Sequence, residues 1–390
     1  EISLGLVGSE MCIRDRFKVI REENYLYVDK SDIVWNMVNL GDKYNYLSRP
    51  RRFGKSVLVD TLESYLEGRK DLFEGLKIMQ LEKDWKQYPV IRLDMSRGGA
   101  NEDTLRSYLN LRFKDYEEKY NITPDPTAML ADRFHAIIAT AYKQTGLRVA
   151  VLIDEYDSPL QHSWRTPEHE KCTGVYREVF AILKADDEYE HFIFITGITK
   201  FTQISLFSVL NNLSNISFMP EYAAICGITE EEIKENFMPE LKQMSEANNW
   251  SVQETHDRLK AYYDGYHFSR RNMVDVYNPY SLVNALKSKE IINFWASSGA
   301  TSLLPKFIDN AELRLSKFEN CSVMRNTLEL SDVSGGGAEL FLYQSGYLTI
   351  KESDEFGYIL GFPNEEVKQA LYETVLPALC LLYTSDAADD

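Results

Sequence analysis

Apolar segments alternate with amphipathic ones along the first half of the chain. The apolar-periodic stretch at 32–40 predicts a helix, and the run at 44–47 predicts a short strand. PVIRLDMS after Pro89 predicts a second strand, and helical patterns fill 101–144 except at the turn-rich TPDPT. The most apolar runs, RVAVLIDEYD from Arg148 and later HFIFITGITKF, predict strands covered on both faces. This alternation predicts a mostly parallel α/β sheet with right-handed crossovers and a ligand site at the carboxyl ends of its strands.

After about Cys226 the pattern becomes helical. ITEEEI places Thr229 three residues before Glu232, which is the spacing of a capping box at a helix start, and the next helix contains SVQETHDRLKAYYDG. Near the end, AELFLYQSG followed by YLTIKESDEFGYILGFPN predicts a helix, a strand, a turn and a strand, the layout of a winged-helix wing. The expected organisation is an α/β core at 17–225, a helical region at 226–310 and a winged-helix-like region at 311–380.

The two ends of the chain differ from the rest. GLVGSEMCIRDR near the start and CLLYTSDAADD at the end show neither helical nor strand periodicity, and both resemble translated sequencing-library adapter. We therefore expect residues 1–16 and 381–390 to be adapter-derived, in which case the natural protein extends further in both directions. The alternative is a natural terminus with an acidic tail.

Composition and charge narrow the class of protein. Hydrophobic residues make up 44% of the 390 positions and charged residues 26%, which is typical of a globular protein rather than a disordered one. The net charge of −17 argues against a body that binds duplex DNA by charge alone, although a local basic site stays open. No run of about 18 apolar residues predicts a membrane-spanning helix. The five cysteines form no CxxC pair, which favours reduced thiols in a cytoplasm over disulfides or a zinc ribbon.

The segment SRPRRFGKS at 48–56 lies between the expected strand at 44–47 and a helical pattern. Gly54, Lys55 and Ser56 match a loop whose backbone amides hold phosphates, whose lysine reaches the β- and γ-phosphates, and whose hydroxyl binds Mg²⁺. The general motif has a glycine where this chain has Arg49, and an arginine fits there only if that residue need not adopt a positive φ. A basic turn before a surface helix is the alternative interpretation. The residues expected to contact the nucleotide are Arg51, Arg52, Phe53, Gly54, Lys55, Ser56 and Val57.

The segment LIDEYD places two carboxylates at the end of the expected strand from Arg148. Phosphoryl transfer requires a carboxylate for the Mg²⁺ shell, expected to be Asp154, and a base that orients and deprotonates water, expected to be Glu155. Acids that enter a solvated loop are the alternative. Tyr156 and Asp157 follow in the loop, where we favour a contact of this site or of a partner, with a solvated loop acid as the alternative for Asp157.

Two other strand ends carry polar residues. Thr196 in ITGITKF is the first choice for a residue that senses the γ-phosphate, and an ordinary strand-end threonine is the alternative. Asp94 at the end of the second strand either contacts the Mg²⁺ region or caps the following turn, and we favour the cap.

The motifs together resemble the bacterial AAA-ATPase-like family of P-loop proteins. YVDKS, LSRPRRFGKS, LIDEYDSPL, FITGITKF, SLFSVLNNLSNISF, ICGITEEEI, YYDGYHF, YNPYSLVNAL and LYQSGYLTI…GFPNEEV occur in order across about 17–370. Members of the family carry RPRRFGKS, so Arg49 matches the family although it departs from the general motif. The resemblance implies an ASCE-type ATPase core with a helical and winged-helix region, often followed by a PD-(D/E)xK nuclease-like domain that is not visible in this chain.

The resemblance carries over to named residues. It assigns Lys55 and Ser56 to the phosphate and Mg²⁺ positions and Asp154 with Glu155 to the Walker B pair. For YDGYHF and NPYSL we expect aromatic packing between the helical region and the core, with interdomain signalling as the alternative. His267 in YDGYHF is expected to be a packed or capping residue, because no acid–base partner has a predictable position beside it.

Three functions fit these observations. The first is a cytoplasmic, Mg²⁺-dependent ATPase that acts as a nucleotide-driven switch for a protein partner or an appended effector domain. The second is a scaffold that binds ATP without hydrolysing it. The third is a protein- or DNA-binding module, for which the acidic C-terminal segment favours protein over DNA. A homo-oligomer stays open, and no arginine finger is identifiable.

Overall fold

The computed structural model describes residues 16–125, 127–200, 213–297, 318–329 and 337–373. Contacts divide the chain into two compact units. Among the described residues, the core unit contains 16–48 and those of 55–216, and the C-terminal unit contains 49–54 and those from 217 onward. The segments expected to be adapter-derived lie outside the described residues, except for Arg16. The contact boundary follows Ile216, and the regions expected at 226–310 and 311–380 fall in one unit.

A five-stranded parallel sheet forms the centre of the core unit, which confirms the predicted α/β class. Its order is β2-β3-β4-β1-β5, so β4 separates the strands that precede the two chemical motifs. The strands are β1 (Tyr44–Ser48), β2 (Val90–Asp94), β3 (Val149–Asp154), β4 (Glu190–Gly197) and β5 (Ser214–Asn215).

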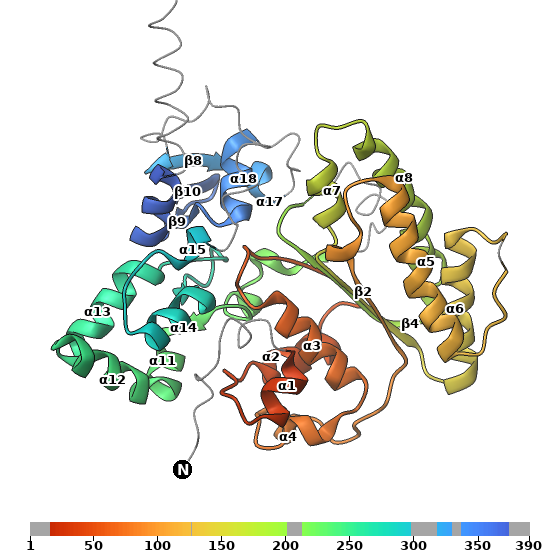
Figure 1. Ribbon diagram of the computed structural model, residues 1–390, viewed down its shortest axis with the longest axis horizontal. Coiled ribbons are helices and arrows are strands. Elements are labelled where there is room, and N and C mark those ends of the chain that lie inside the picture. Colours follow the sequence, from red (N-terminus) through yellow and green to blue (C-terminus); the bar gives the residue numbers. More distant parts are fainter. Residues whose placement is uncertain (1–15, 126, 201–212, 298–317, 330–336, 374–390) are drawn as a thin grey trace, which may run out of the picture. The chain divides into compact units, whose positions relative to one another are not determined.

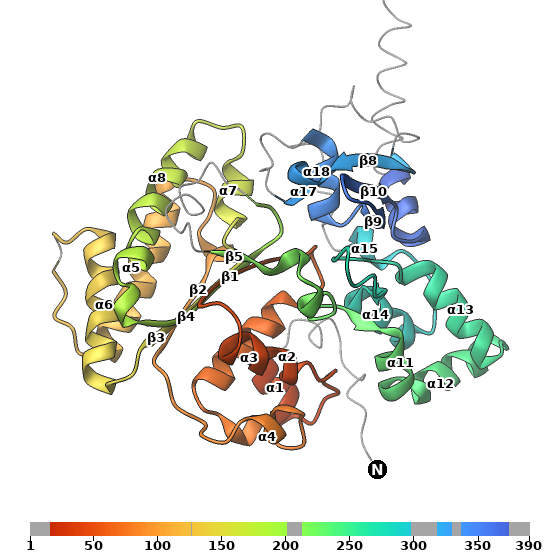
Figure 2. The same cartoon turned by 180° about the vertical axis from the view of Figure 1, so that it is seen from behind.

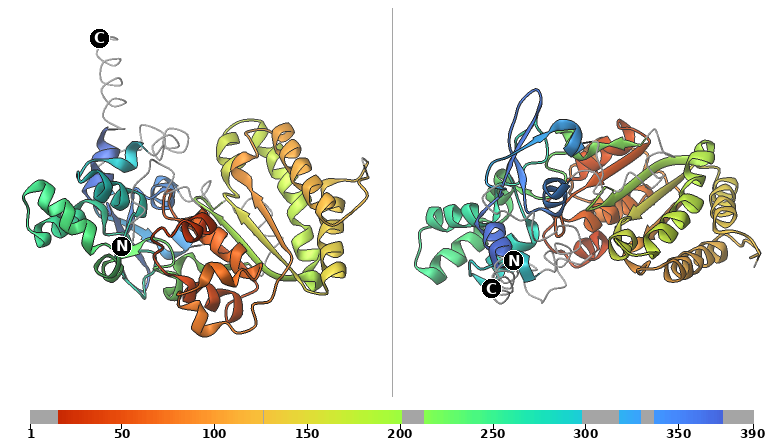
Figure 3. Two further views of the ribbon diagram at one scale, coloured as in Figure 1. Left: turned by 60° about the horizontal axis from the view of Figure 1, so that its bottom comes forward. Right: turned by 90° about the horizontal axis from the view of Figure 1, so that it is seen from above.

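Helices cover both faces of this sheet. The helices drawn in red to dark orange lie on one face, and those drawn in amber, yellow and olive lie on the other (Figure 3). The first group is α1 (Phe17–Glu22), α2 (Ser31–Asn39), α3 (Lys55–Leu66) and α4 (Ile78–Leu81); the second includes α5 (Glu102–Lys119), α6 (Leu130–Thr145), α7 (Ser158–Ser163), α8 (Glu168–Phe180) and α9 (Ile182–Ala185). Short 3₁₀ turns occupy Lys70–Phe73, Met95–Arg97 and Asp187–Tyr189.

The apolar pattern of each element matches the face that it buries. All residues of β3 are buried, as its continuous apolar run predicts for a strand between two helical layers. In α6 the buried side chains recur at helical spacing, at Leu130, Phe134, Ile137, Ile138 and Ala141. Each large aliphatic side chain buried in this way contributes about 1.5–3 kcal/mol to folding.

The C-terminal unit contains helices and two small antiparallel sheets (Figures 1 and 2). Its helices are α11 (Glu230–Asn236), α12 (Met238–Asn248), α13 (Val252–Tyr263), α14 (Pro279–Ser288), α15 (Phe294–Ser297), α17 (Arg325–Glu329) and α18 (Gly337–Ser345). The strands are β6 (Ile228–Thr229) paired with β7 (Val276–Tyr277), and β8 (Cys321–Met324), β10 (Gly357–Gly361) and β9 (Thr349–Ser353) in that order. Short 3₁₀ turns lie at Ile216–Phe218 and Pro220–Tyr222.

Two sequence predictions for this unit are confirmed. Thr229 and Glu232 form a reciprocal capping box at the start of α11. The order helix, strand, turn, strand is present in α18, β9 and β10. Strand β8, which pairs with β10, was not predicted, because four residues of alternating burial give too short a pattern. The winged-helix assignment itself stays a prediction. Within the described residues, no helix combines the length and the apolar character that crossing a membrane requires.

Candidate nucleotide-binding site

The loop between β1 and α3 contains two residues with positive φ. It leaves the sheet after Ser48 and enters α3 at Lys55. Within it, Arg52 has φ +68° and Gly54 has φ +84°, so the chain reverses through two left-handed residues. A Cβ on Gly54 would meet nothing within 4 Å, so the glycine is required by its φ and not by crowding. The loop leads directly into the N-terminus of α3, and the first-turn amides of a helix favour an anion in front of them.

Arg49, which replaces the first glycine of the general motif, does not have a positive φ, as the sequence argument required. Its side chain is 1% exposed, and its guanidinium donates to the carbonyls of Ser217 and Tyr222, both at 2.9 Å. The guanidinium also lies 4.2 Å from the ring centre of Phe268. Arg49 is therefore a buried packing residue of the C-terminal unit.

Two further loop side chains belong to the same packing. Phe53 is 1% exposed and meets the rings of Tyr266 and Phe268 edge-on, at centroid distances of 4.7 and 5.4 Å. The guanidinium of Arg52 lies 4.5 Å from the ring centre of Tyr280. Because these side chains are engaged, we expect Arg52 and Phe53 to contact a nucleotide through their backbone amides.

Asp154 at the end of β3 has the environment of a Mg²⁺ ligand. Its carboxylate is 2% exposed and accepts hydrogen bonds from the side chain of Ser56 and, at 2.9 Å, from the amide of Glu155. Burial and the neighbouring Glu155 raise the pKa of Asp154 to about 6, and the Ser56 hydrogen bond and the charges of Arg92 and Lys55 oppose that rise. A hydroxyl and a carboxylate in contact at a helix N-terminus fit Mg²⁺, which takes one or two protein ligands together with substrate phosphates and water.

Glu155 stands where the chain turns away from the sheet. It is half-buried and has φ +46°, a conformation that costs a non-glycine residue about 1–3 kcal/mol. The next amide, that of Tyr156, donates to the carbonyl of Thr196 at 3.0 Å and so ties this turn to β4. The backbone strain places a carboxylate directly beside Asp154.

Arg92 on β2 is a site residue that the sequence argument missed. Its guanidinium donates to Asp60 and, at 2.7 Å, to Glu63, both on α3, and lies 3.8 Å from the carboxylate of Asp154. These acids raise the pKa of Arg92 despite its burial, so it stays charged. The available signal was an arginine in an otherwise apolar strand together with two acids three positions apart on the helix.

Thr196 lies at the end of β4, between the strands of the two motifs, as its proposed sensor role requires. Its side chain is fully buried and its hydroxyl donates to the carbonyl of Leu47 at 2.8 Å. The hydroxyl therefore links β4 to β1, and its role as a sensor stays a prediction.

The alternatives for three other residues are settled by their contacts. Asp157 is 1% exposed and accepts from the amides of Ile198 and Thr199, at 3.0 and 2.6 Å, so it is not a solvated loop acid. Asp94 caps the 3₁₀ turn that follows β2, as favoured. His267 is packed, with Nε2 2.7 Å from the carboxylate of Asp275.

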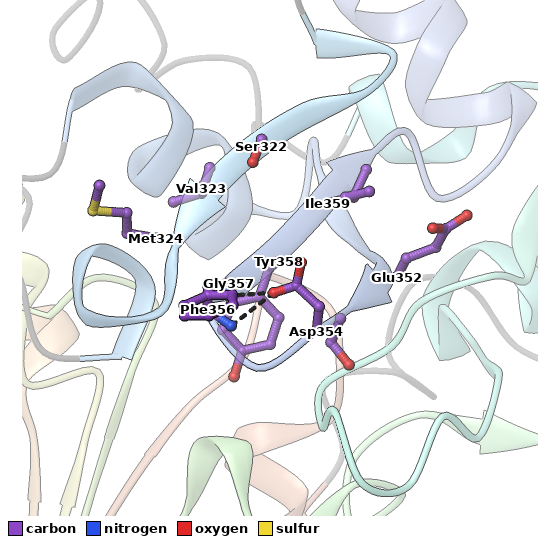
Figure 4. A pocket seen from close by; sticks show the side chains of 10 residues that line it. Ser322, Val323, Met324, Glu352, Asp354, Phe356, Gly357, Tyr358 and Ile359 are labelled. Atoms are coloured by element: carbon purple, nitrogen blue, oxygen red, sulfur yellow. Dashed lines mark hydrogen bonds between the residues drawn. The ribbon is translucent and has the colours of Figure 1, made fainter.

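A separate hollow of about 220 Å³ lies on the small sheet of β8, β10 and β9 (Figure 4). Gly357, Met324 and Phe356 line it, together with the carboxylates of Glu352 and Asp354. No lysine or arginine lines it, so it does not suit a nucleotide's phosphates. In the described residues no group of three or more His, Cys, Asp or Glu side chains could hold a metal ion.

The fold and the loop define a P-loop NTPase core. The chain belongs to the AAA-ATPase-like family: the sequence model of that family, described as "Predicted AAA-ATPase", matches residues 12–207.

Individual proteins resemble the chain to different degrees. A protein of Azotobacter chroococcum mcd 1, named "Uncharacterized protein in vnfD 5'region", is 33% identical over 370 residues, which cover 92% of this chain and 68% of that protein. Among solved structures, the Aeropyrum pernix Orc1 protein in complex with DNA aligns at 11% identity over 87% of this chain and 89% of that one, with a TM-score of 0.27. Cdc6p from Pyrobaculum aerophilum aligns at 12% identity over 97% of both chains, also with a TM-score of 0.27. At these TM-scores neither likeness bears on function.

Proposed function

We propose that the protein is a Mg²⁺-dependent ATPase. The observation that carries this proposal is the contact between Ser56, in the first turn of α3, and Asp154, at the end of β3. It joins the phosphate-binding loop to a buried carboxylate, with Lys55 and Glu155 adjacent to the two members of the pair. A hydroxyl and carboxylate that served only the fold would not need a lysine and a second acid beside them.

Each residue has a chemical role in this proposal. The Lys55 ammonium and the loop amides bind the β- and γ-phosphates, and Ser56 and Asp154 hold Mg²⁺. When bound, the ion neutralises charge on the phosphate oxygens. Glu155 orients the attacking water and takes its proton, with its carboxylate held near Asp154 by the turn after β3. The positive charge of Arg92 attracts the Asp154 carboxylate, 3.8 Å away, and helps to keep it ionised.

The output of hydrolysis would be a conformational switch. The loop side chains pack within the C-terminal unit, whereas β1 and α3 on either side of the loop belong to the core unit. A change in the loop on nucleotide binding would therefore act on both units. The switch would act on a protein partner or an appended effector domain. The net charge of −17 does not favour a nucleic acid as the partner.

Binding of labelled ATP with and without Mg²⁺, followed by phosphate release, tests the proposal. Lys55→Ala should abolish binding, with exposed Lys184→Ala as the matched control. Glu155→Gln should keep binding and slow hydrolysis by about 10²–10⁴-fold, the range for a lost general base, with exposed Glu170→Gln as its control. Unchanged binding by Lys55→Ala would refute the loop assignment. Binding without turnover in the unmutated protein would favour the scaffold.

A further inference from the structure

The phosphate-binding loop is unusual in what its side chains touch. Arg49, Pro50 and Phe53 pack within the C-terminal unit, to which residues 49–54 belong, although the strand before the loop and the helix after it belong to the core unit. We infer that Arg49 and Phe53 are positioning residues that link nucleotide occupancy of the loop to the 263–268 segment of the C-terminal unit. This inference rests on the proposed nucleotide binding.

Arg49 is suited to fix the start of the loop. One guanidinium nitrogen donates to the carbonyl of Ser217 and another to that of Tyr222, so a single side chain satisfies two carbonyls five residues apart. A planar fork of donors can do this, whereas a lysine offers one ammonium at one point. Burial lowers the pKa of the guanidinium, which still gains these two hydrogen bonds and the face of Phe268.

Phe53 fixes the other end of the loop, immediately before Gly54. Phe268 is shared, because it contacts both Arg49 and Phe53. The ring of Tyr266 also meets that of Phe53 edge-on, and it is stacked with the ring of Phe268. The two ends of the loop are thus held by one aromatic cluster from YYDGYHF.

The aromatic cluster is itself tied to the rest of the C-terminal unit. The amide of His267 donates to the hydroxyl of Thr349 on β9 at 2.7 Å, and that hydroxyl lies 3.1 Å from the carbonyl of His267. A Cβ on Gly265 would come within 2.3 Å of the Pro363 carbonyl oxygen, so this backbone is in close contact with the residues after β10. A chain of direct contacts therefore runs from the loop to β9.

Gly346 adds a second contact to the loop. It follows α18 with φ +90°, and a Cβ there would lie 2.7 Å from Cβ of Pro50. Both its φ and the close approach of Pro50 require glycine. The turn between α18 and β9 is therefore fitted directly against the phosphate-binding loop.

These contacts have a thermodynamic consequence. Phosphate binding requires the loop amides to face the ligand, and the loop side chains sit in close-packed surroundings that do not deform continuously. Nucleotide should therefore stabilise the packed arrangement of 263–268 and 217–222. Linkage is reciprocal, so a substitution that loosens the packing of these segments should weaken nucleotide binding. For coupled sites the change in affinity is about 5–150-fold.

Hydrogen exchange on the full chain, with and without Mg²⁺ and the non-hydrolysable analogue AMP-PNP, tests the inference. In the unmutated protein, the nucleotide should slow exchange in 217–222 and 263–268 and leave 239–248 in α12 unchanged. Arg49→Lys and Phe53→Leu should reduce that protection and lower AMP-PNP affinity about 5–150-fold. In ATP hydrolysis they should raise KM by a larger factor than they lower kcat, because Glu155 and Asp154 are untouched.

Leu241→Ala is the matched control, because Leu241 is 1% exposed in α12 and its loss destabilises the same unit away from the loop. It should leave AMP-PNP affinity unchanged. Affinity and protection equal to wild type in both Arg49→Lys and Phe53→Leu would overturn the inference, as would an equal loss of affinity in Leu241→Ala. If the unmutated protein binds no AMP-PNP, the proposed function fails and the inference falls with it. Nucleotide binding without protection in 263–268 overturns the inference alone.

Discussion

Arg92→Leu should strongly destabilise the core unit, because it removes the partner of a buried acid. The substitution leaves Asp60, whose side chain is 7% exposed, without its guanidinium partner, and Glu63 and Asp154 lose the same charge. Removing one partner of a buried ion pair costs about 3–5 kcal/mol. For a unit of 150–250 residues, each kcal/mol lowers Tm by about 2–4 °C, so calorimetry should show a decrease of roughly 6–20 °C.

The same variant should show a characteristic pH dependence. Burial already raises the pKa of Asp60, and the charge of Arg92 is the largest influence that opposes the rise. Without Arg92 the folded-state pKa rises further above the unfolded value. Such a carboxyl favours the folded state when protonated, and that stability is lost as pH rises through the folded pKa. The difference from wild type should thus be smallest near pH 4, about the ordinary carboxyl pKa, and should grow toward pH 7.

The control for this prediction is Arg97→Leu. Arg97 is 69% exposed and its Nε lies 3.9 Å from the Asp94 carboxylate, so its loss should cost less than about 1 kcal/mol. An Arg92→Leu transition within about 2 °C of wild type at pH 7, or a deficit that does not change with pH, would refute the argument that Arg92 compensates the buried acids.

Two further predictions concern Asp154 and the glycines. The pKa of Asp154 is raised to about 6, and the carboxylate must be ionised to bind Mg²⁺, so Mg²⁺-dependent hydrolysis should fall as pH drops through 6. Asp154→Asn should show little hydrolysis at any pH. A pH–rate profile checks both expectations, and a flat wild-type profile from 5 to 8 would contradict the first. Gly197→Ala should lower the free energy of unfolding by about 1–3 kcal/mol, because its Cβ would lie 2.4 Å from Oδ1 of Asp157. Gly174→Ala in α8 should raise it by about 0.5–1 kcal/mol, because the added Cβ would meet nothing within 4 Å. Thermal unfolding measures both changes, and equal effects would contradict the argument.

Local patterns in the sequence were sufficient to predict much of the core unit. The continuous apolar runs predicted β3 and β4, because each run consists of neighbours in the chain. The residue types at 54–56 and 154–155 predicted a nucleotide site, and that assignment stays a prediction.

The remainder depends on contacts between distant residues. Arg92 acts because β2 lies next to β3, and the order of strands has no local signal. For Asp157 the sequence left a site contact and a solvated loop acid both open, because the amides that bury it come from the residues just after β4. The destination of the Arg49 side chain, on carbonyls at 217 and 222, likewise could not be inferred from the residues around it.

The strand order also explains why α3 is central to the site. Because β4 lies between β1 and β3, the ends of these two strands are about 10 Å apart, at roughly 4.8 Å per neighbouring pair. The end of β4 fills this gap, which separates Ser48, at the end of β1, from Asp154. Helix α3 crosses the gap, since it starts at the end of the loop and packs on β2 and β3.

The position of α3 over β3 is held by charge as well as by apolar packing. Arg92 on β2 pairs with Asp60 and Glu63, which lie one and two turns beyond Ser56 along the helix. A shift of α3 that broke these pairs would also separate Ser56 from Asp154. Arg92 therefore acts on the Mg²⁺ pair through the helix as well as through its own charge. For this reason Arg92→Lys, which keeps the charge but not the fork, should weaken Mg²⁺-dependent ATP binding under conditions in which the core unit is still folded.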